Sequence, residues 1–126
     1  MTRKYSFIVD GTLPGLNEYI AKTNVNKFRG NKFKQETEDI ITVFIKKQLN
    51  GVNIKEPVTV DFAWFEPDKK RDKDNIAFAK KFIFDALVKS KVLANDGWAC
   101  VDGFSDRFYV DANSPRVVVT LIPLTI

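Results

Sequence analysis

Two aspartates, Asp72 and Asp74, are the residues whose type and spacing most directly indicate chemistry. They follow a basic triplet, Lys69-Lys70-Arg71, and a third aspartate, Asp96, comes later in the chain. In an extended segment, side chains two residues apart point the same way, so the two carboxylates face a common point. A hard divalent cation with oxygen ligands would relieve their mutual repulsion. The spacing therefore predicts a metal site.

A strand and a helix must position these aspartates. Apolar and polar residues alternate along Val58–Phe65, which predicts a strand. Asp74 or Asn75 can cap a helix that begins at Ile76. Asp72 and Asp74 therefore lie in the loop between the two elements.

The predicted helix has two distinct faces. Its apolar face consists of Ile76, Ala79, Phe82, Ile83, Ala86, Leu87 and Ser90. The opposite stripe consists of Asp74, Phe78, Lys81 and Asp85. Lys81 thus projects from the same side of the helix as Asp74. After the helix, Asn95-Asp96-Gly97 predicts a turn, which brings Asp96 back only if the chain folds towards the helix start.

These motifs together match the pattern of a known family. Arg71-Asp72-Lys73-Asp74-Asn75, then Lys81, then Phe84-Asp85-Ala86-Leu87 and then Asn95-Asp96 resemble the RusA family of Holliday junction resolvases. The resemblance implies that catalysis rests on Asp72, Asp74, Asp96 and Lys81, with the three aspartates holding Mg²⁺, or Mn²⁺ in its place. The segment before Phe84 is longer than in the family, so Lys80 is an alternative to Lys81 as the catalytic lysine. We choose Lys81 because it lies one helical turn before Asp85, as in the family, and on the Asp74 stripe.

The resemblance also implies a reaction and a partner. It implies paired, symmetric nicks in a four-way DNA junction, with a metal-activated water attacking the phosphodiester and leaving a 5′-phosphate and a 3′-hydroxyl. Lys81 would stabilise charge on the phosphate or help to deprotonate the water. Because a junction has two strands to cut and one chain supplies one site, we expect a homodimer. Its interface is either the open face of the sheet or the exposed side of the second helix with Phe78. Relatives of this type are typical of phages and prophages.

A basic segment from Lys22 to Lys34 contains Phe28 and Phe33 and no acidic residue. Basic side chains neutralise phosphates, and aromatic rings stack on or wedge against unpaired bases, so we interpret the segment as a junction-binding loop. The alternative is a solvated basic face whose phenylalanines pack on the core. The DNA-binding candidates are Lys27, Arg29, Lys32, Lys34, Lys69, Lys70, Arg71 and Asn17. Asn17 resembles family asparagines in position and could approach the scissile phosphate, or it forms a local cap.

Composition narrows the chemistry. The chain has no histidine, which excludes serine-histidine and cysteine-histidine triads and most zinc sites. Its single cysteine, Cys100, fits a reducing cytoplasm. The net charge of +4 suits nucleic acid without establishing it. No apolar run reaches membrane-spanning length, and we expect neither a membrane association nor a small-molecule cofactor.

The expected fold is α+β, close to α/β, in one RusA-like endonuclease domain over residues 1–126. The order strand, helix, strand, helix, strand, strand gives a mixed four-stranded sheet with two helices. The expected strands are Tyr5–Val9, Val58–Phe65, Arg107–Asp111 and Arg116–Ile122, and the first helix covers about 31–49. The last two strands form a hairpin, and Val117–Val119 is covered on both faces.

Several acids and two other functions are alternatives. Glu36, Glu38 and Asp39 suit the first turns of a helix better than a metal, and Asp61, Asp106 and Asp111 suit structural roles. A non-catalytic branched-DNA-binding protein would explain the basic loop but not the clustered acids. A flap or branch endonuclease of looser specificity is the main rival within nucleases. In a metal-free domain, the acids would only be helix caps and turns.

Overall fold

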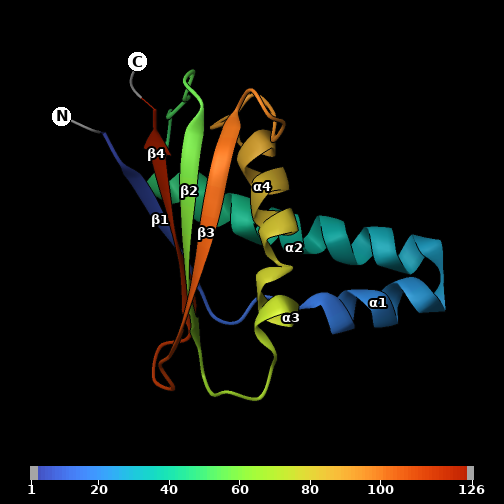
Figure 1. Ribbon diagram of the computed structural model, residues 1–126. Coiled ribbons are helices and arrows are strands. Elements are labelled where there is room, and N and C mark those ends of the chain that lie inside the picture. The colour runs from blue at the N-terminus through green and yellow to red at the C-terminus, as the bar shows by residue number, and fades with distance from the viewer. Residues whose placement is uncertain (1–2, 125–126) are drawn as a thin grey trace.

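The computed structural model describes residues 3–124, which form one mixed sheet with helices on one of its faces (Figure 1). The elements in chain order are β1 (Tyr5–Asp10), α1 (Leu16–Val25), α2 (Lys27–Gln48), β2 (Val58–Glu66), α3 (Lys73–Ala77), α4 (Lys80–Lys89), β3 (Val101–Val110) and β4 (Arg116–Pro123). The four strands have the spatial order β1-β4-β2-β3. The expected mixed four-stranded sheet of the α+β class is confirmed.

The inner strand β2 separates β3 from β4. It pairs with β4 in antiparallel and with β3 in parallel orientation. The predicted hairpin between the last two strands is therefore wrong. The connecting residues 111–115 cross the end of β2, a span of two strand spacings or about 10 Å. Hydrogen bonds of 2.8 Å from the Asp111 N–H to the Glu66 carbonyl and from the Gly11 N–H to the Pro115 carbonyl hold this connection.

The first helical region is longer than expected. Helix α1 occupies a segment that we predicted to be a loop, and α2 begins at Lys27 instead of about residue 31. The Asn26 side chain caps α2 by accepting a hydrogen bond of 2.8 Å from the Arg29 N–H. The basic segment is therefore helical, and α1 with the first half of α2 projects away from the sheet (Figure 1).

The second predicted helix is two helices, α3 and α4, separated by a turn at Phe78–Ala79. Helix α3 begins at Lys73 with Asp72 at its N-cap, not at Ile76 as expected. The order of elements is therefore strand, two helices, strand, two helices, strand, strand. Strand β3 spans Val101–Val110, so the predicted strand Arg107–Asp111 overlaps only its last four residues and extends one residue too far.

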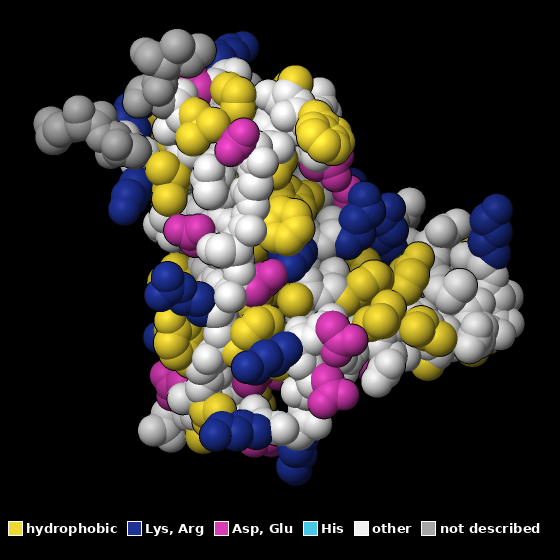
Figure 2. Space-filling view, viewed as in Figure 1, with side chains coloured by type: hydrophobic (Ala, Val, Ile, Leu, Met, Phe, Trp, Pro, Cys, Tyr) yellow, Lys and Arg dark blue, Asp and Glu magenta, His cyan; other side chains and the backbone are white. Residues whose placement is uncertain are grey.

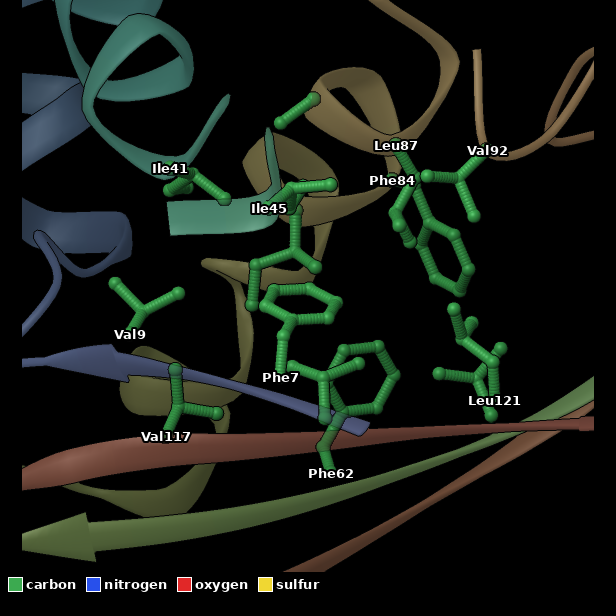
Figure 3. Packing of buried hydrophobic residues seen from close by; sticks show 14 of the residues in the cluster. Phe7, Val9, Ile41, Ile45, Phe62, Phe84, Leu87, Val92, Val117 and Leu121 are labelled. Atoms are coloured by element: carbon green, nitrogen blue, oxygen red, sulfur yellow. The ribbon is translucent and has the colours of Figure 1, made fainter. Parts of the chain in front are cut away.

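The core is a layer of side chains between the helices and one face of the sheet (Figure 3). Its fully buried members include Phe7, Phe62, Val119 and Leu121 from the sheet and Ile41, Ile45, Ile83 and Leu87 from the helices. The predicted apolar face of the second helical region is confirmed, because all of its members except the half-buried Ser90 are buried. Among residues 3–124, no helix lies on the other face of the sheet, and Val118 on that face is only half-buried. The prediction that Val117–Val119 is covered on both faces is therefore wrong for the single chain.

Across residues 3–124, every helix is too short or too polar to cross a membrane.

Candidate active site

A buried ion pair holds the loop that leads to the first two aspartates. At the end of β2, the Glu66 carboxylate accepts hydrogen bonds of 3.0 and 2.9 Å from Nε and Nη2 of Arg71. Arg71 Nη1 donates to the Leu13 carbonyl at 3.1 Å and lies 3.7 Å from Glu18 Oε1. The guanidinium therefore ties the end of β2 to the segment before α1. Its donors are directed into the protein, although the sequence suggested a DNA contact.

Asp72 and Asp74 line one cavity of about 740 Å³. The cavity lies where β2 and β3 end, and its other borders are Glu66, Asp68, Lys69, Arg71, Lys73, Ile76, Phe108, Tyr109 and Val110. Asp74 Oδ1 accepts a hydrogen bond of 2.9 Å from the Asn75 N–H, whereas Asp72 makes no side-chain capping bond. Asp74 is helical, so the extended-chain argument for a shared direction does not apply, yet both side chains reach the same cavity.

Asn75 attaches this segment to the start of α1. Its Oδ1 accepts a hydrogen bond of 2.9 Å from the Asn17 N–H. The backbone of Gly15 passes so close that a Cβ there would lie 2.6 Å from Asn75 Oδ1 and 2.9 Å from Arg71 Nη1. Only glycine leaves room for this contact. Asn17 is thus held beside the aspartate-bearing helix through its backbone.

Lys81 lies between two acids on the exposed side of α4. Its Nζ is 3.6 Å from Asp85 Oδ1 and 3.7 Å from Asp96 Oδ2, and 57 % of its side chain is exposed. The turn after α4 therefore does return Asp96 to the helix. This return could not be established from the sequence.

Lys80 has a different environment. Its ammonium forms an ion pair with Asp106 on β3, lies 4.4 Å from the centre of the Phe104 ring, and only 17 % of the side chain is exposed. The other carboxylate oxygen of Asp106 accepts a hydrogen bond of 2.8 Å from Trp64 Nε1. Lys80 thus fastens α4 to the sheet, and Lys81 is the more exposed of the two lysines.

The three predicted aspartates do not form a single cluster. Among residues 3–124, no three acidic, cysteine or histidine side chains are arranged to hold a metal ion. Mg²⁺, however, commonly keeps several waters and binds one or two carboxylates together with substrate phosphates. The oxygen donors of Asp72 and Asp74, which share a cavity, fit that requirement.

An ion-pair network joins α2 to α4 beside this region. Lys34 Nζ lies 3.4 Å from Asp85 Oδ2 and 3.7 Å from Glu38 Oε2, and neither oxygen has a hydrogen-bond partner in the described part of the chain. Lys89 Nζ lies 2.8 Å from Glu38 Oε1, and this hydrogen bond raises the pKa of Lys89. Glu38 is therefore a structural acid at the interface between the two helices.

The remaining DNA-binding candidates are on α2 and on the loop after β2. Lys27, Arg29 and Lys32 are exposed on α2, and Lys69 and Lys70 are exposed on the loop. Lys32 and Lys70 have only weak acidic neighbours, at 4.0 and 3.9 Å. Within residues 3–124, Lys27, Arg29 and Lys69 form no ion pair.

Four supporting residues were missed as parts of the site. Glu66 and Gly15 position the loop that carries the aspartates. Asp85 pairs with Lys81 at the surface, and Asp106 pairs with Lys80 against the sheet. Only Asp85 had a usable signal, its spacing of one helical turn from Lys81. The other three act through contacts between distant segments.

A pair of carboxylates bordered by lysines at the end of a mixed sheet is an arrangement that enzymes acting on phosphate esters use. The family model for the endodeoxyribonuclease RusA matches residues 14–122. The chain therefore belongs to the RusA family of endodeoxyribonucleases, as its motifs indicated, and is a nuclease of a family that acts on branched DNA junctions. A comparison with curated proteins finds no match.

Proposed function

We propose that this protein is a single-domain, Mg²⁺-dependent nuclease that resolves Holliday junctions by paired, symmetric nicks. The observation that carries the proposal is the cavity shared by Asp72 and Asp74, with Lys69 and Lys73 at its border. Two carboxylates alone would repel a phosphate backbone, and the lysines offset that repulsion. The site can therefore admit both a cation and the DNA strand that it cuts.

In this proposal Asp72 and Asp74 hold the Mg²⁺, and Asp96 completes the acidic set when the substrate is bound. Mg²⁺ would supply an activated water and polarise the scissile phosphate. Lys81 lies 3.7 Å from Asp96 in the free protein and, with substrate bound, would offer its ammonium to the charge that develops on the phosphate. Asp85 orients Lys81 from one helical turn away.

The DNA backbone would follow the exposed basic residues. Lys69 and Lys70 lie next to the acidic cavity, and Lys27, Arg29 and Lys32 extend the positive surface along α2. Lys34 and Arg71 already form ion pairs with acids of the same chain. They still add positive charge to this surface, but their acidic partners offset part of it. Asn17 stands next to the aspartate-bearing helix, where its side chain can approach the backbone of the substrate.

Two symmetric nicks require two sites, so we propose that a homodimer is the active form. Of the two expected interfaces, the side of the second helical region with Phe78 is less suitable. Phe78 packs against Tyr19 and Phe82, with ring centroids 5.5 and 5.6 Å apart. The open face of the sheet carries the stacked rings of Phe65 and Tyr109, 4.9 Å apart. This face is our candidate interface.

The test is cleavage of a labelled four-way junction, next to a linear duplex and a flap of the same sequence, with Mg²⁺, Mn²⁺ or EDTA. Paired, symmetric nicks that need the metal and are confined to the junction support the proposal. Preferential cutting of the flap would instead show a branch endonuclease of looser specificity. Tight junction binding without cutting in either metal would leave a non-catalytic DNA-binding protein.

The two lysines provide a matched pair for the same assay. Lys81→Met should abolish most cleavage and leave the unfolding temperature unchanged, because Lys81 is exposed. Lys80→Met should lower the unfolding temperature, because it leaves the Asp106 carboxylate unpaired and mostly buried. The reverse result would move the catalytic role to Lys80.

A further inference from the structure

Helices α1 and α2 form a hairpin that extends beyond the sheet and the other helices (Figure 1). The two helices approach closely at Gly30, where a Cβ would lie 2.8 Å from Thr23 Oγ1. Thr23 Oγ1 in turn donates a hydrogen bond of 2.9 Å to the Tyr19 carbonyl. The hairpin is therefore a packed unit, which can carry a side chain at its tip in a defined position.

An aromatic cluster anchors the root of the hairpin to the active-site helices. The rings of Tyr19 and Phe33 lie 5.9 and 6.4 Å from the ring of Phe82. Tyr19 also lies 5.5 Å from Phe78, which follows directly after α3. Phe33 is thus part of this packing, although its half-buried ring also borders a hollow near the tip of the hairpin. The hairpin has a fixed position relative to the helix that carries Asp74.

The tip of the hairpin is both apolar and basic. Val25 and Phe28 are 63 % and 74 % exposed and place apolar surface at the tip. A hollow of about 350 Å³ at this end is lined by Lys22, Phe28, Arg29, Lys32, Phe33 and Glu36. Glu36 is its single acid and lies 4.0 Å from Lys32. The chain has no acidic residue from 19 to 35. Figure 2 shows exposed hydrophobic side chains and Lys or Arg side chains on this projecting arm.

The charges at the tip need an anionic partner. Lys27 lies in the first turn of α2 and Arg29 close behind it, where the helix dipole disfavours positive charge. A protein partner with a purely apolar surface would leave these cations unpaired, and a uniform DNA duplex would leave Phe28 in water. Phosphates beside unstacked bases satisfy both features, because every base offers a face to an aromatic ring. A branch point provides that combination.

We propose that the tip of the α1–α2 hairpin is a wedge that stacks Phe28, supported by Val25, on unpaired bases at the branch point of the DNA. Lys22, Lys27, Arg29 and Lys32 hold the flanking phosphates. The wedge rests on the proposed function for its ligand, a branched DNA. It adds a second contact site, separate from the acidic cavity, that distinguishes a junction from a duplex.

The test uses junctions with 2-aminopurine at the branch point or, as a reference, within one arm, in EDTA so that no strand is cut. Wild-type protein should raise the fluorescence of the branch-point probe and leave the arm probe unchanged. Phe28→Ala should lose this rise and bind the junction on the order of tenfold more weakly, with its duplex affinity retained. Phe28→Trp should restore both.

Ile40→Ala is the matched control, because Ile40 is a 57 % exposed apolar residue on the same helix but away from the tip. It should behave as wild type. The wedge is refuted if Phe28→Ala matches wild type in fluorescence and affinity. It is also refuted if Phe28→Ala, with an unchanged unfolding temperature, weakens junction and duplex binding equally. Because binding is scored without cleavage, a protein that fails to cut junctions would overturn the proposed function and leave this result standing.

Discussion

Replacement of Arg71 by lysine tests whether Arg71 stabilises the fold or contacts the DNA. Arg71 and Glu66 share two hydrogen bonds of 3.0 and 2.9 Å, and their side chains are only 21 % and 10 % exposed. Lysine keeps the charge but cannot reproduce the paired geometry of the guanidinium. It loses one charge-assisted hydrogen bond, which is worth about 1.5–3 kcal/mol, so we expect a loss of about 2 kcal/mol in the free energy of unfolding.

For a chain of this size, that loss corresponds to a decrease of about 8 °C in the unfolding midpoint. The assay is thermal unfolding followed by circular dichroism. Arg107→Lys is the control, because Arg107 is exposed on β3 and forms no ion pair within residues 3–124. Glu66→Gln should destabilise the protein at least as much as Arg71→Lys, because it leaves the guanidinium charge without its main partner.

The reasoning would be refuted if Arg71→Lys unfolded at the wild-type temperature while junction affinity fell. Arg71 would then contact the DNA directly, as the sequence alone suggested, and the pair with Glu66 would open on binding.

Two further predictions concern the cavity and the sheet end. Gly15→Ala should slow junction cleavage by about tenfold to a hundredfold, because its Cβ would displace Asn75 and the aspartate-bearing helix, whereas Gly103→Ala, with nothing within 4 Å, should not. The hydrogen bond from Arg116 holds the pKa of Asp111 below its ordinary value of 3.8, so the stability that this pair adds is present above that value and is lost as the pH falls through the folded-state pKa. An NMR titration should show the pKa of Asp111 rising towards its ordinary value in Arg116→Met, although the backbone N–H groups of Asn113 and Ser114 still lower it, and an unchanged pKa would contradict the assignment.

The sequence was sufficient to predict what depends on local periodicity. The apolar face from Ile76 to Leu87 followed from helical spacing, and the alternation in β2 gave its buried face. Asp74 and Lys81 were placed on the solvent side for the same reason. These features need only the geometry of a single element.

The hairpin of α1 and α2 could not be predicted, because α1 has no buried residue and so no clear apolar stripe. It is held by contacts with distant residues, such as those of Tyr19 with Phe78 and Phe82. The place of β2 between β3 and β4 also depends on long-range pairing. Because β3 and β4 follow each other in the sequence, a hairpin between them was expected. In the structure each of them pairs with β2 instead.

The roles of the two lysines had the same limit. Lys80 and Lys81 are neighbours in sequence. The spacing to Asp85 favoured Lys81 as the catalytic lysine, but it gave no role for Lys80. The explanation is Asp106, a β3 residue that lies across from α4 and binds Lys80. The nuclease assignment rests on the match of the motifs to a family. The contacts of Lys80 and Lys81 show only how the fold places the two lysines.

The most direct test of the central claim is the single-turnover rate of junction cleavage by Asp74→Asn against Asp68→Asn. Both aspartates line the same cavity, but Asp68 lies close to Lys70 and is not among the proposed metal ligands. We expect Asp74→Asn to lose cleavage by about a thousandfold or more while junction binding persists, because the variant loses a ligand of the catalytic metal but keeps the basic residues that contact the DNA. Asp68→Asn should cut at close to the wild-type rate. Equal rates for the two variants would show that the cavity around Asp72 and Asp74 is not the catalytic site.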